Sequence, residues 1–332
     1  MSATPTTRSN QVGAWPDRPR LAPREPGCPG PGVEHAFPSG RAAILACLRL
    51  AGIGRASVVA TPECVTGCLA DAVRRLAQPL SYPAALSHPA GLGAAIVYEQ
   101  WGWPLPPEAE DAVRERFAGV PVIVDRVDSA DFLAVPRTFG RFEVLSLSKV
   151  LGLDAGGLAR RGSDRASIRF EPPESSRRAP VAEHPRLASH PAVRELFKQS
   201  DHVHPAVLRW LADNCAITAL EAERCTRNRT AGLILDTQLS AGWPTWMTRA
   251  IASGAGPVWA PVLRGGDAAD HRCALDTLHR TWGIRASVRI FNWSGNPLSP
   301  CYAPSIALPI HSGVECPAEI VATLVTPSGR AR

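Results

Sequence analysis

Only two lysines occur in a chain that otherwise uses arginine for its positive charges, and one of them, Lys149, follows an apolar stretch, FEVLSLS. A lysine amine can lose its proton and attack a carbonyl carbon, which an arginine guanidinium cannot do. Ser146 and Ser148 precede it with hydroxyls suited to an anion, and a glycine-rich turn, GLDAGG, follows. A surface lysine at a strand end is the plainer interpretation of Lys149 alone, and its neighbours are what favour a reactive amine.

A carboxylate and a helix start stand upstream of that lysine. Asp125 ends a second apolar stretch, VPVIVD. A carboxylate there could keep a pyridine nitrogen protonated, which makes a pyridoxal ring an electron sink; an aspartate capping the next loop is the alternative. Ser39 is placed to cap a helix opening at Gly40 and Arg41. The amides at a helix start form a seat for a phosphate.

The elements that must position these residues alternate between strands and helices. Apolar runs predict strands at 57–61, 94–98, 120–125 and 142–148, and helical periodicity predicts helices at 41–50, 65–76 and 108–117. Such alternation indicates an α/β fold with a mostly parallel central sheet flanked by helices. Ligands of these sheets bind at the carboxyl ends of the strands, where Asp125 and Lys149 are expected to lie.

Three parts are predicted along the 332 residues. A Pro/Gly/Arg-rich N-terminal leader covers 1–32, a large domain covers 33–235, and a small C-terminal α+β domain covers 236–332. Residues 162–200 are polar and rich in Pro and Arg, which favours an excursion from the large domain. The remaining elements predicted are a helix at about 205–239, a strand at 258–263, a helix at 271–282, a strand at 287–291, an irregular stretch at 292–304 and a last helix from Pro317.

Composition narrows the classes of function. The net charge is +6 and the pI about 9.0, but the arginines are scattered rather than clustered, which argues against nucleic-acid binding. No apolar run reaches the roughly 18 residues of a membrane span, and the N-terminus lacks a signal-peptide core, so a cytoplasmic protein is expected. The nine cysteines include no CxxC pair, and no metal site is predicted. Cys64 and Cys68 share a helical face, as small buried thiols do.

The order of these motifs resembles the fold-type-I pyridoxal 5'-phosphate (PLP) enzymes, and more narrowly the keto-sugar aminotransferase family of the DegT/DnrJ type. The segments that carry the resemblance are FPSGRAAILACLRLAGIG, AAIVYEQWGWPLPPEAEDAV, VIVDRVDSAD, SLSKVLGLDAGG, ERCTRNRTAG and IALPIHSGVECPAEIVATL. They fall within residues 35–328. The resemblance implies an aspartate-aminotransferase-like fold and PLP as the cofactor.

The resemblance also implies roles for individual residues. Lys149 would hold the cofactor as an internal aldimine, and Asp125 would pair with the pyridinium nitrogen. Asp128 stands where the family usually has a His or Gln near the phenolic oxygen. Ser146 would bind the phosphate, with the Ser148 hydroxyl beside it.

Two further phosphate contacts follow from the same resemblance. The amides of Gly40 and Arg41 would bind the phosphate from the helix start. Asn228 would reach the phosphate of a neighbouring subunit, which requires a homodimer with shared active sites. The residue that stacks on the cofactor ring is not evident, because the segment that usually supplies an aromatic side chain is TPECVTG; Trp101 is a candidate.

The predicted reaction is transamination between a small-molecule amino donor and a keto substrate: a keto-sugar, a cyclitol or a small natural-product ketone. One alternative is PLP-dependent elimination, substitution or aldol-type chemistry on the same fold. A second alternative is a non-catalytic paralogue that acts as a binding or dimer partner. The presence of both Asp125 and Lys149 argues against the second, because a degenerate copy has no need of them.

Overall fold

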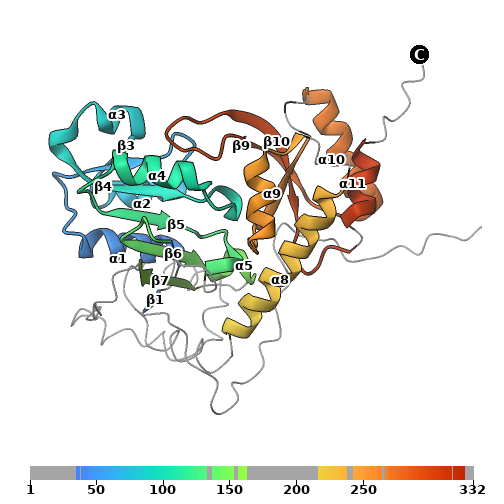
Figure 1. Ribbon diagram of the computed structural model, residues 1–332, viewed down its shortest axis with the longest axis horizontal. Helices are drawn as coiled ribbons and strands as arrows, with labels where there is room; N and C mark the ends of the chain where they lie inside the picture. Colours follow the sequence, from blue (N-terminus) through green and yellow to red (C-terminus); the bar gives the residue numbers. More distant parts are fainter. Residues whose placement is uncertain are drawn as a thin grey trace, which may run out of the picture.

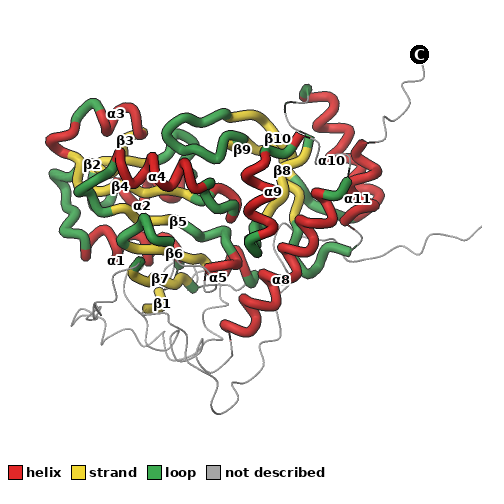
Figure 2. The backbone as a smooth tube through the Cα atoms, viewed as in Figure 1, coloured by secondary structure: helices red, strands yellow, loops and turns green. Residues whose placement is uncertain are grey.

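The computed structural model describes residues 35–37, 39–132, 137–152, 156–162, 216–237, 242–263, 265, 267–315 and 317–325. A seven-stranded sheet and a three-stranded sheet lie side by side with helices around them (Figures 1 and 2). None of the described helices is long and apolar enough to cross a membrane. The predicted leader, Lys198 and nearly all of the predicted excursion at 162–200 lie outside the described residues.

The larger sheet has the strand order β1-β7-β6-β5-β4-β2-β3. Its five strands from β3 to β6 pair in parallel, whereas β7 pairs antiparallel with β6 and with β1. The bounds are β1 His35–Phe37, β2 Val58–Thr61, β3 Gln78–Ser81, β4 Leu92–Tyr98, β5 Val122–Asp125, β6 Phe142–Ser146 and β7 Gly157–Arg161. The prediction of a mostly parallel sheet is confirmed.

Helices cover both faces of this sheet. Helices α1 (Gly40–Leu50) and α2 (Gly67–Arg74) pack on one face, and α3 (Tyr82–Leu86) and α4 (Pro107–Arg116) pack on the other. The apolar run of β4 explains how one strand serves both layers. Ile96 belongs to the core under α1, whereas Ala95 and Val97 belong to the core under α4, because successive side chains of a strand point to opposite faces.

The smaller sheet is antiparallel, with the order β8-β10-β9. Its bounds are β8 Trp259–Val262, β9 Ser287–Asn292 and β10 Tyr302–Pro309; the helices near it are α8 Ala216–Leu235, α9 Thr245–Ala252, α10 Ala268–Trp282 and α11 Pro317–Val325. Buried aromatic side chains fill the space between the two sheets. Trp101 stacks obliquely on Phe291 at 4.8 Å between ring centroids, and Trp103 meets Trp243 edge-on at 5.4 Å.

Three short helices near the larger sheet are η1 (Pro89–Gly91), η2 (Gln100–Gly102) and η3 (Ala130–Phe132), and α5 (Leu147–Val150) follows β6 directly. Helix α1 begins as predicted, since the Ser39 hydroxyl accepts a hydrogen bond from Ala42 N at 3.2 Å. The glycine at position 102 has φ +84°, and a Cβ there would lie 2.1 Å from the Asp128 carbonyl oxygen. This turn therefore packs directly against the backbone after β5.

Some sequence predictions were wrong. Residues 292–304 are not wholly irregular, because β9 extends to Asn292 and β10 begins at Tyr302. Cys64 and Cys68 are exposed rather than buried. They do not share a helical face, because α2 begins only at Gly67. The helix predicted at 205–239 is found over the described part, as α8. The domain boundary at 235/236 stays a prediction.

Candidate active site

The parallel strands bring chemistry-bearing residues to one edge of the larger sheet. Tyr98 ends β4 and Asp125 ends β5, and the two residues pair directly across the strands, so their side chains point to the same face. Ser146 ends β6, and Lys149 lies one turn further on in α5. The predicted position of Asp125 at a strand end is confirmed. The strand predicted over 142–148 ends at Ser146, so Lys149 lies in α5 and not at the strand end.

Asp125 is a buried carboxylate, 4% exposed. Its Oδ1 accepts a hydrogen bond from Val127 N at 3.2 Å. Burial raises its pKa to about 7, the Lys149 ammonium opposes that rise, and the nearby Asp128 carboxylate adds to it. A positively charged group placed against this carboxylate would relieve the cost of its burial.

Asp128 pairs with Lys149. Lys149 Nζ lies 3.2 Å from Asp128 Oδ1 and 3.4 Å from Oδ2, and the Tyr98 phenol donates a hydrogen bond to Oδ2. Asp128 is fully buried, and its Oδ1 has no hydrogen-bond partner of good geometry. Burial alone lowers the pKa of the Lys149 ammonium, but Asp128 and Asp125 outweigh this and leave the pKa raised.

The start of α1 lies against the end of β6. A Cβ at position 40 would lie 2.8 Å from Val127 Cγ1 and 3.2 Å from Ser146 Cβ, so the glycine lets the helix start pack closely against the end of β6. The Ser146 and Ser148 hydroxyls are 3.0 Å apart. The first amides of a helix have no acceptor within the helix. Gly40, Arg41 and the two serines can therefore form one anion seat.

Asn228 has a local role that the sequence did not suggest. Its Nδ2 donates to the carbonyl oxygens of Ile251 and Ala255, at 2.8 and 3.0 Å, and so ties α8 to the end of α9. The neighbouring Arg227 is fully buried and donates from Nη2 to the Val150 carbonyl oxygen at 2.6 Å, directly after Lys149. A contact of Asn228 with a second subunit stays a prediction.

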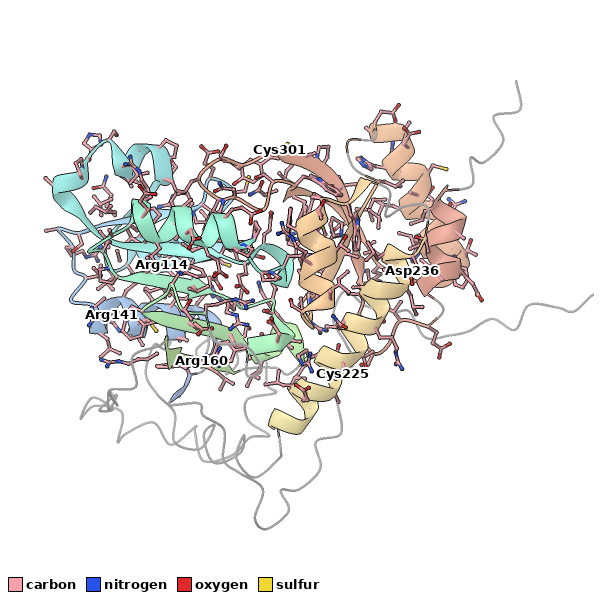
Figure 3. The ribbon with its side chains drawn as sticks, viewed as in Figure 1. Arg114, Arg141, Arg160, Cys225, Asp236 and Cys301 are labelled. Carbon is pink, nitrogen blue, oxygen red and sulfur yellow. The ribbon has the colours of Figure 1, made fainter. Side chains whose placement is uncertain are left out.

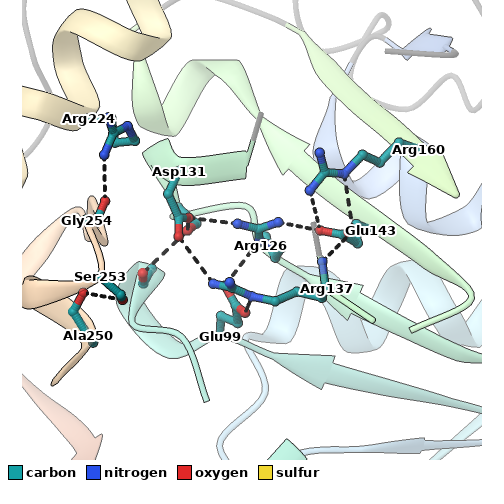
Figure 4. Close-up of polar contacts among 12 residues, drawn as sticks. Glu99, Arg126, Asp131, Arg137, Glu143, Arg160, Arg224, Ala250, Ser253 and Gly254 are labelled. Atoms are coloured by element: carbon teal, nitrogen blue, oxygen red, sulfur yellow. Dashed lines mark hydrogen bonds and ion pairs between the residues drawn. The ribbon is translucent and has the colours of Figure 1, made fainter. Parts of the chain in front are cut away.

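The opposite face of the same strand ends carries a buried cluster of three arginines and three carboxylates (Figure 4). We call it the ion cluster; its members are Glu99, Arg126, Asp131, Arg137, Glu143 and Arg160. Arg126 contacts all three carboxylates, with Nη2 2.8 Å from Asp131 and Nε 3.2 Å from Glu99. Arg160 lies on β7 (Figure 3), and its Nη2 is 2.9 Å from Glu143 Oε2 (Figure 4).

Sequence reasoning missed the ion cluster and Tyr98. Trp101, the candidate for stacking on a cofactor, is instead 3% exposed and packs against Trp259 and Phe291 in the core. Alternation could have revealed Tyr98, because it ends a strand beside Asp125. The ion cluster brings together side chains from position 99 to position 160, which no local pattern connects.

Comparisons with known proteins define the fold. No family model matches the chain, and no curated protein sequence matches it. Among solved structures, a DegT DnrJ EryC1 StrS aminotransferase from Brucella abortus is 15% identical, with a TM-score of 0.54, covering 88% of this chain and 86% of its own. The aminotransferase TlmJ from Streptoalloteichus hindustanus is 17% identical, with a TM-score of 0.53 and coverage of 87% and 84%.

A third similar structure is 3-amino-5-hydroxybenzoic acid synthase, 16% identical, with a TM-score of 0.53, covering 88% of this chain and 86% of its own. The chain therefore has the fold of these aminotransferase structures. The predicted aspartate-aminotransferase-like, fold-type-I architecture is confirmed. At these identities the likeness describes the fold, and the chemistry has to be argued from the residues of the site.

Proposed function

We propose that this protein is a PLP-dependent aminotransferase whose acceptor is a keto-sugar, a cyclitol or a small natural-product ketone. The observation that carries the proposal is the meeting of Lys149 and Asp125 at adjacent strand ends, beside the start of α1, in a fold shared with aminotransferases. Each of the three features is common alone. Together they match the aldehyde, the ring nitrogen and the phosphate of a single cofactor.

The residues at this edge fit PLP on physical grounds. Asp125 is a buried carboxylate whose pKa is raised by burial, so a pyridinium nitrogen would stabilise its charged form. The close approach of Gly40 to Ser146 leaves helix amides and hydroxyls together, as a phosphate dianion requires. Lys149 is the described lysine at the sheet edge, and its side chain is 34% exposed, so a ligand can reach it.

When bound, PLP would supply an electron sink for the pair of electrons left when a proton departs from the substrate carbon. Asp125 would hold the ring nitrogen in its protonated form. The α1 amides and the Ser146 hydroxyl would fix the phosphate and thereby orient the ring. Lys149 Nζ would accept a proton from one carbon and deliver it to another, as a general base and then a general acid.

We further propose a cytoplasmic homodimer. Asn228 lies on α8 beside Arg227, and Arg227 donates a hydrogen bond to the carbonyl oxygen of Val150, the residue that follows Lys149. This places α8 near the proposed cofactor site, where it could contact a second subunit. Sedimentation of the PLP-loaded protein at micromolar concentration should give twice the 35.4 kDa of one chain. A monomer with cofactor bound would contradict shared sites and would leave the PLP proposal standing.

The test of the reaction is a visible spectrum of the PLP-loaded protein mixed with single amino acids. An aminotransferase should convert the bound cofactor to pyridoxamine phosphate with its amino donor, and should release the matching keto acid. Release of ammonia or a cleaved product without that conversion would favour the elimination or aldol alternative. A protein that binds no PLP would contradict the proposal and favour the non-catalytic alternative.

A further inference from the structure

We propose that Tyr98 is a positioning residue that fixes Asp128 as the counter-ion of Lys149, so that Lys149 rests as an ammonium and its nucleophilic amine is masked. This gives Asp128 a partner within the chain, in place of the cofactor's phenolic oxygen. The proposal concerns the proton on Lys149 and holds whether or not PLP is the cofactor. Its failure is therefore distinguishable from failure of the proposed function.

The phenol oxygen of Tyr98 takes part in two hydrogen bonds, one as the donor and one as the acceptor. It donates to Asp128 Oδ2 and accepts from Trp101 N at 3.2 Å. Trp101 has φ +60°, in the left-handed region that a tryptophan adopts only when its surroundings impose it. Its ring is buried against Trp259 and Phe291, which supplies that constraint.

The same turn fixes the backbone of Asp128. A Cβ on the glycine at position 102 would lie 2.1 Å from the Asp128 carbonyl oxygen, and 3.0 Å from Pro257 Cα. The turn after β4 therefore positions both the donor and the acceptor of the Tyr98–Asp128 hydrogen bond. Lys149 Nζ lies 3.2 Å from Oδ1 and 3.4 Å from Oδ2, so the ammonium contacts the carboxylate that the phenol holds in place.

Charged or titratable groups on neighbouring elements face the Lys149–Asp128 ion pair. Asp125 on β5 and Cys68 on α2 both raise the pKa of Lys149. Burial lowers the pKa of Arg227 on α8, and the charge of Asp128 partly opposes this. Burial raises the pKa of the Tyr98 phenol well above its usual range, and Asp128 raises it further, so the phenol keeps its proton and remains a donor. The net field at Lys149 favours the ammonium over the amine.

An ammonium at this position is a hydrogen-bond donor and a poor nucleophile, because only the neutral amine attacks a carbonyl. Lys149 would donate a hydrogen bond from Nζ to the oxygen of an incoming carbonyl compound, and no covalent bond would form or break while the ammonium stays paired with Asp128. A ligand group that donates to Asp128 Oδ1 would break the pair and release the amine.

The test measures the reactivity of the amine directly. Full-length protein with Lys198→Arg carries Lys149 as its single lysine; dialysis against hydroxylamine removes bound carbonyl compounds. Formaldehyde and cyanoborohydride then methylate Lys149, and peptide mass spectrometry follows its rate from pH 7 to 10 relative to the α-amino group. Asp128→Asn should raise the rate at pH 8 by about tenfold or more, since each pKa unit changes the neutral fraction tenfold.

Tyr98→Phe should raise the rate by a smaller factor, because the carboxylate remains but is no longer held. The matched control is Tyr82→Phe, which removes a buried phenol that donates to the Ile96 carbonyl oxygen at 2.7 Å, away from Lys149. That variant should match the parent. A proton effect shifts the pH profile, whereas a change of access scales the rate equally at every pH.

Two results would overturn the proposal. If Asp128→Asn leaves the pH profile in place, Asp128 is not the counter-ion of Lys149. If Asp128→Asn shifts the profile but Tyr98→Phe does not, Tyr98 is not a positioning residue. Equal shifts for Tyr98→Phe and Tyr82→Phe would also count against it, because they would reflect a general loosening of the sheet.

Discussion

The two faces of the same strand ends carry buried charges that are arranged differently. Tyr98 and Asp125 point to the α1 face, and the residues that follow them, Glu99 and Arg126, point to the other. In the ion cluster, three arginines balance three carboxylates, and every carboxylate contacts at least one guanidinium. On the α1 face, one lysine stands against two carboxylates, and Asp128 Oδ1 lacks a hydrogen-bond partner.

This difference in charge balance distinguishes a structural cluster from a site suited to chemistry. A balanced, hydrogen-bonded set of buried ions contributes a fixed geometry, because no member can be lost without leaving a bare charge behind. An unbalanced set has a titratable group with a shifted pKa and room for a cationic ligand, which is typical of functional sites. The two sets of charges are adjacent in the chain, because Arg126 of the ion cluster directly follows Asp125. The backbone N of Arg126 donates to the Val144 carbonyl oxygen and so holds this junction against β6.

The largest effect is expected at Lys149. Lys149→Ala removes the only described lysine at the sheet edge, and turnover should fall by at least about 10²–10⁴-fold, because the same amine binds the carbonyl and moves the proton. A loss of thermal stability should accompany the loss of turnover, because the fully buried Asp128 loses its ion-pair partner. Initial rates with the best amino donor measure the effect, with Lys198→Ala as the control. A comparable loss of turnover in both variants would contradict a specific chemical role for Lys149 on the α1 face.

Breaking the ion cluster should instead cost stability. Arg126→Met leaves Glu99, Asp131 and Glu143 with too little positive charge, and the free energy of unfolding in urea should fall by about 3–5 kcal/mol. Arg114→Met is the matched control, because Arg114 pairs with Asp111 on the surface and should contribute no more than about 1 kcal/mol. Similar losses in the two variants would mean that the cluster is not a structural unit.

The sequence predicted the parallel core of the fold and the edge that carries Asp125 and Ser146 better than the rest. Strands β2, β4 and β5 are mostly apolar runs because they are largely buried on both faces, and β6 is apolar apart from Glu143 and Ser146. Strand β3 (QPLS) is partly exposed and polar, and β7 (GLARR) ends in two arginines, so neither has an apolar pattern. Their place in the sheet comes from pairing with β2 and β6.

The same reasoning explains the residues of the site. Asp125 and Ser146 lie directly at strand ends, which the apolar runs mark, and Lys149 follows in α5. The pairing of Tyr98 with Asp128 depends on a turn with a positive φ and on a residue three positions beyond β5. The local bonds of Asn228 depend on where α9 ends. Tertiary packing decides both, and neither leaves a local pattern in the sequence.

The pH dependence of stability sharpens the comparison at Asp125. Its pKa of about 7 in the folded chain lies above the value near 4 of an unfolded aspartate. The stability that this carboxyl contributes is therefore complete below about pH 4 and is lost as the pH rises through 7. Relative to the parent without cofactor, Asp125→Asn should gain roughly 2 kcal/mol in unfolding free energy between pH 5 and 8. Urea titrations at several pH values measure this, and a constant difference would contradict the buried, unbalanced charge.

The central claim is that Lys149 is the residue to which the cofactor attaches. Borohydride treatment of the PLP-loaded protein, followed by proteolysis and mass spectrometry of the two lysine-containing peptides, tests it most directly. The account predicts a reduced pyridoxyl group on Lys149 and none on Lys198. A pyridoxyl group on Lys198, or on neither lysine, would contradict it.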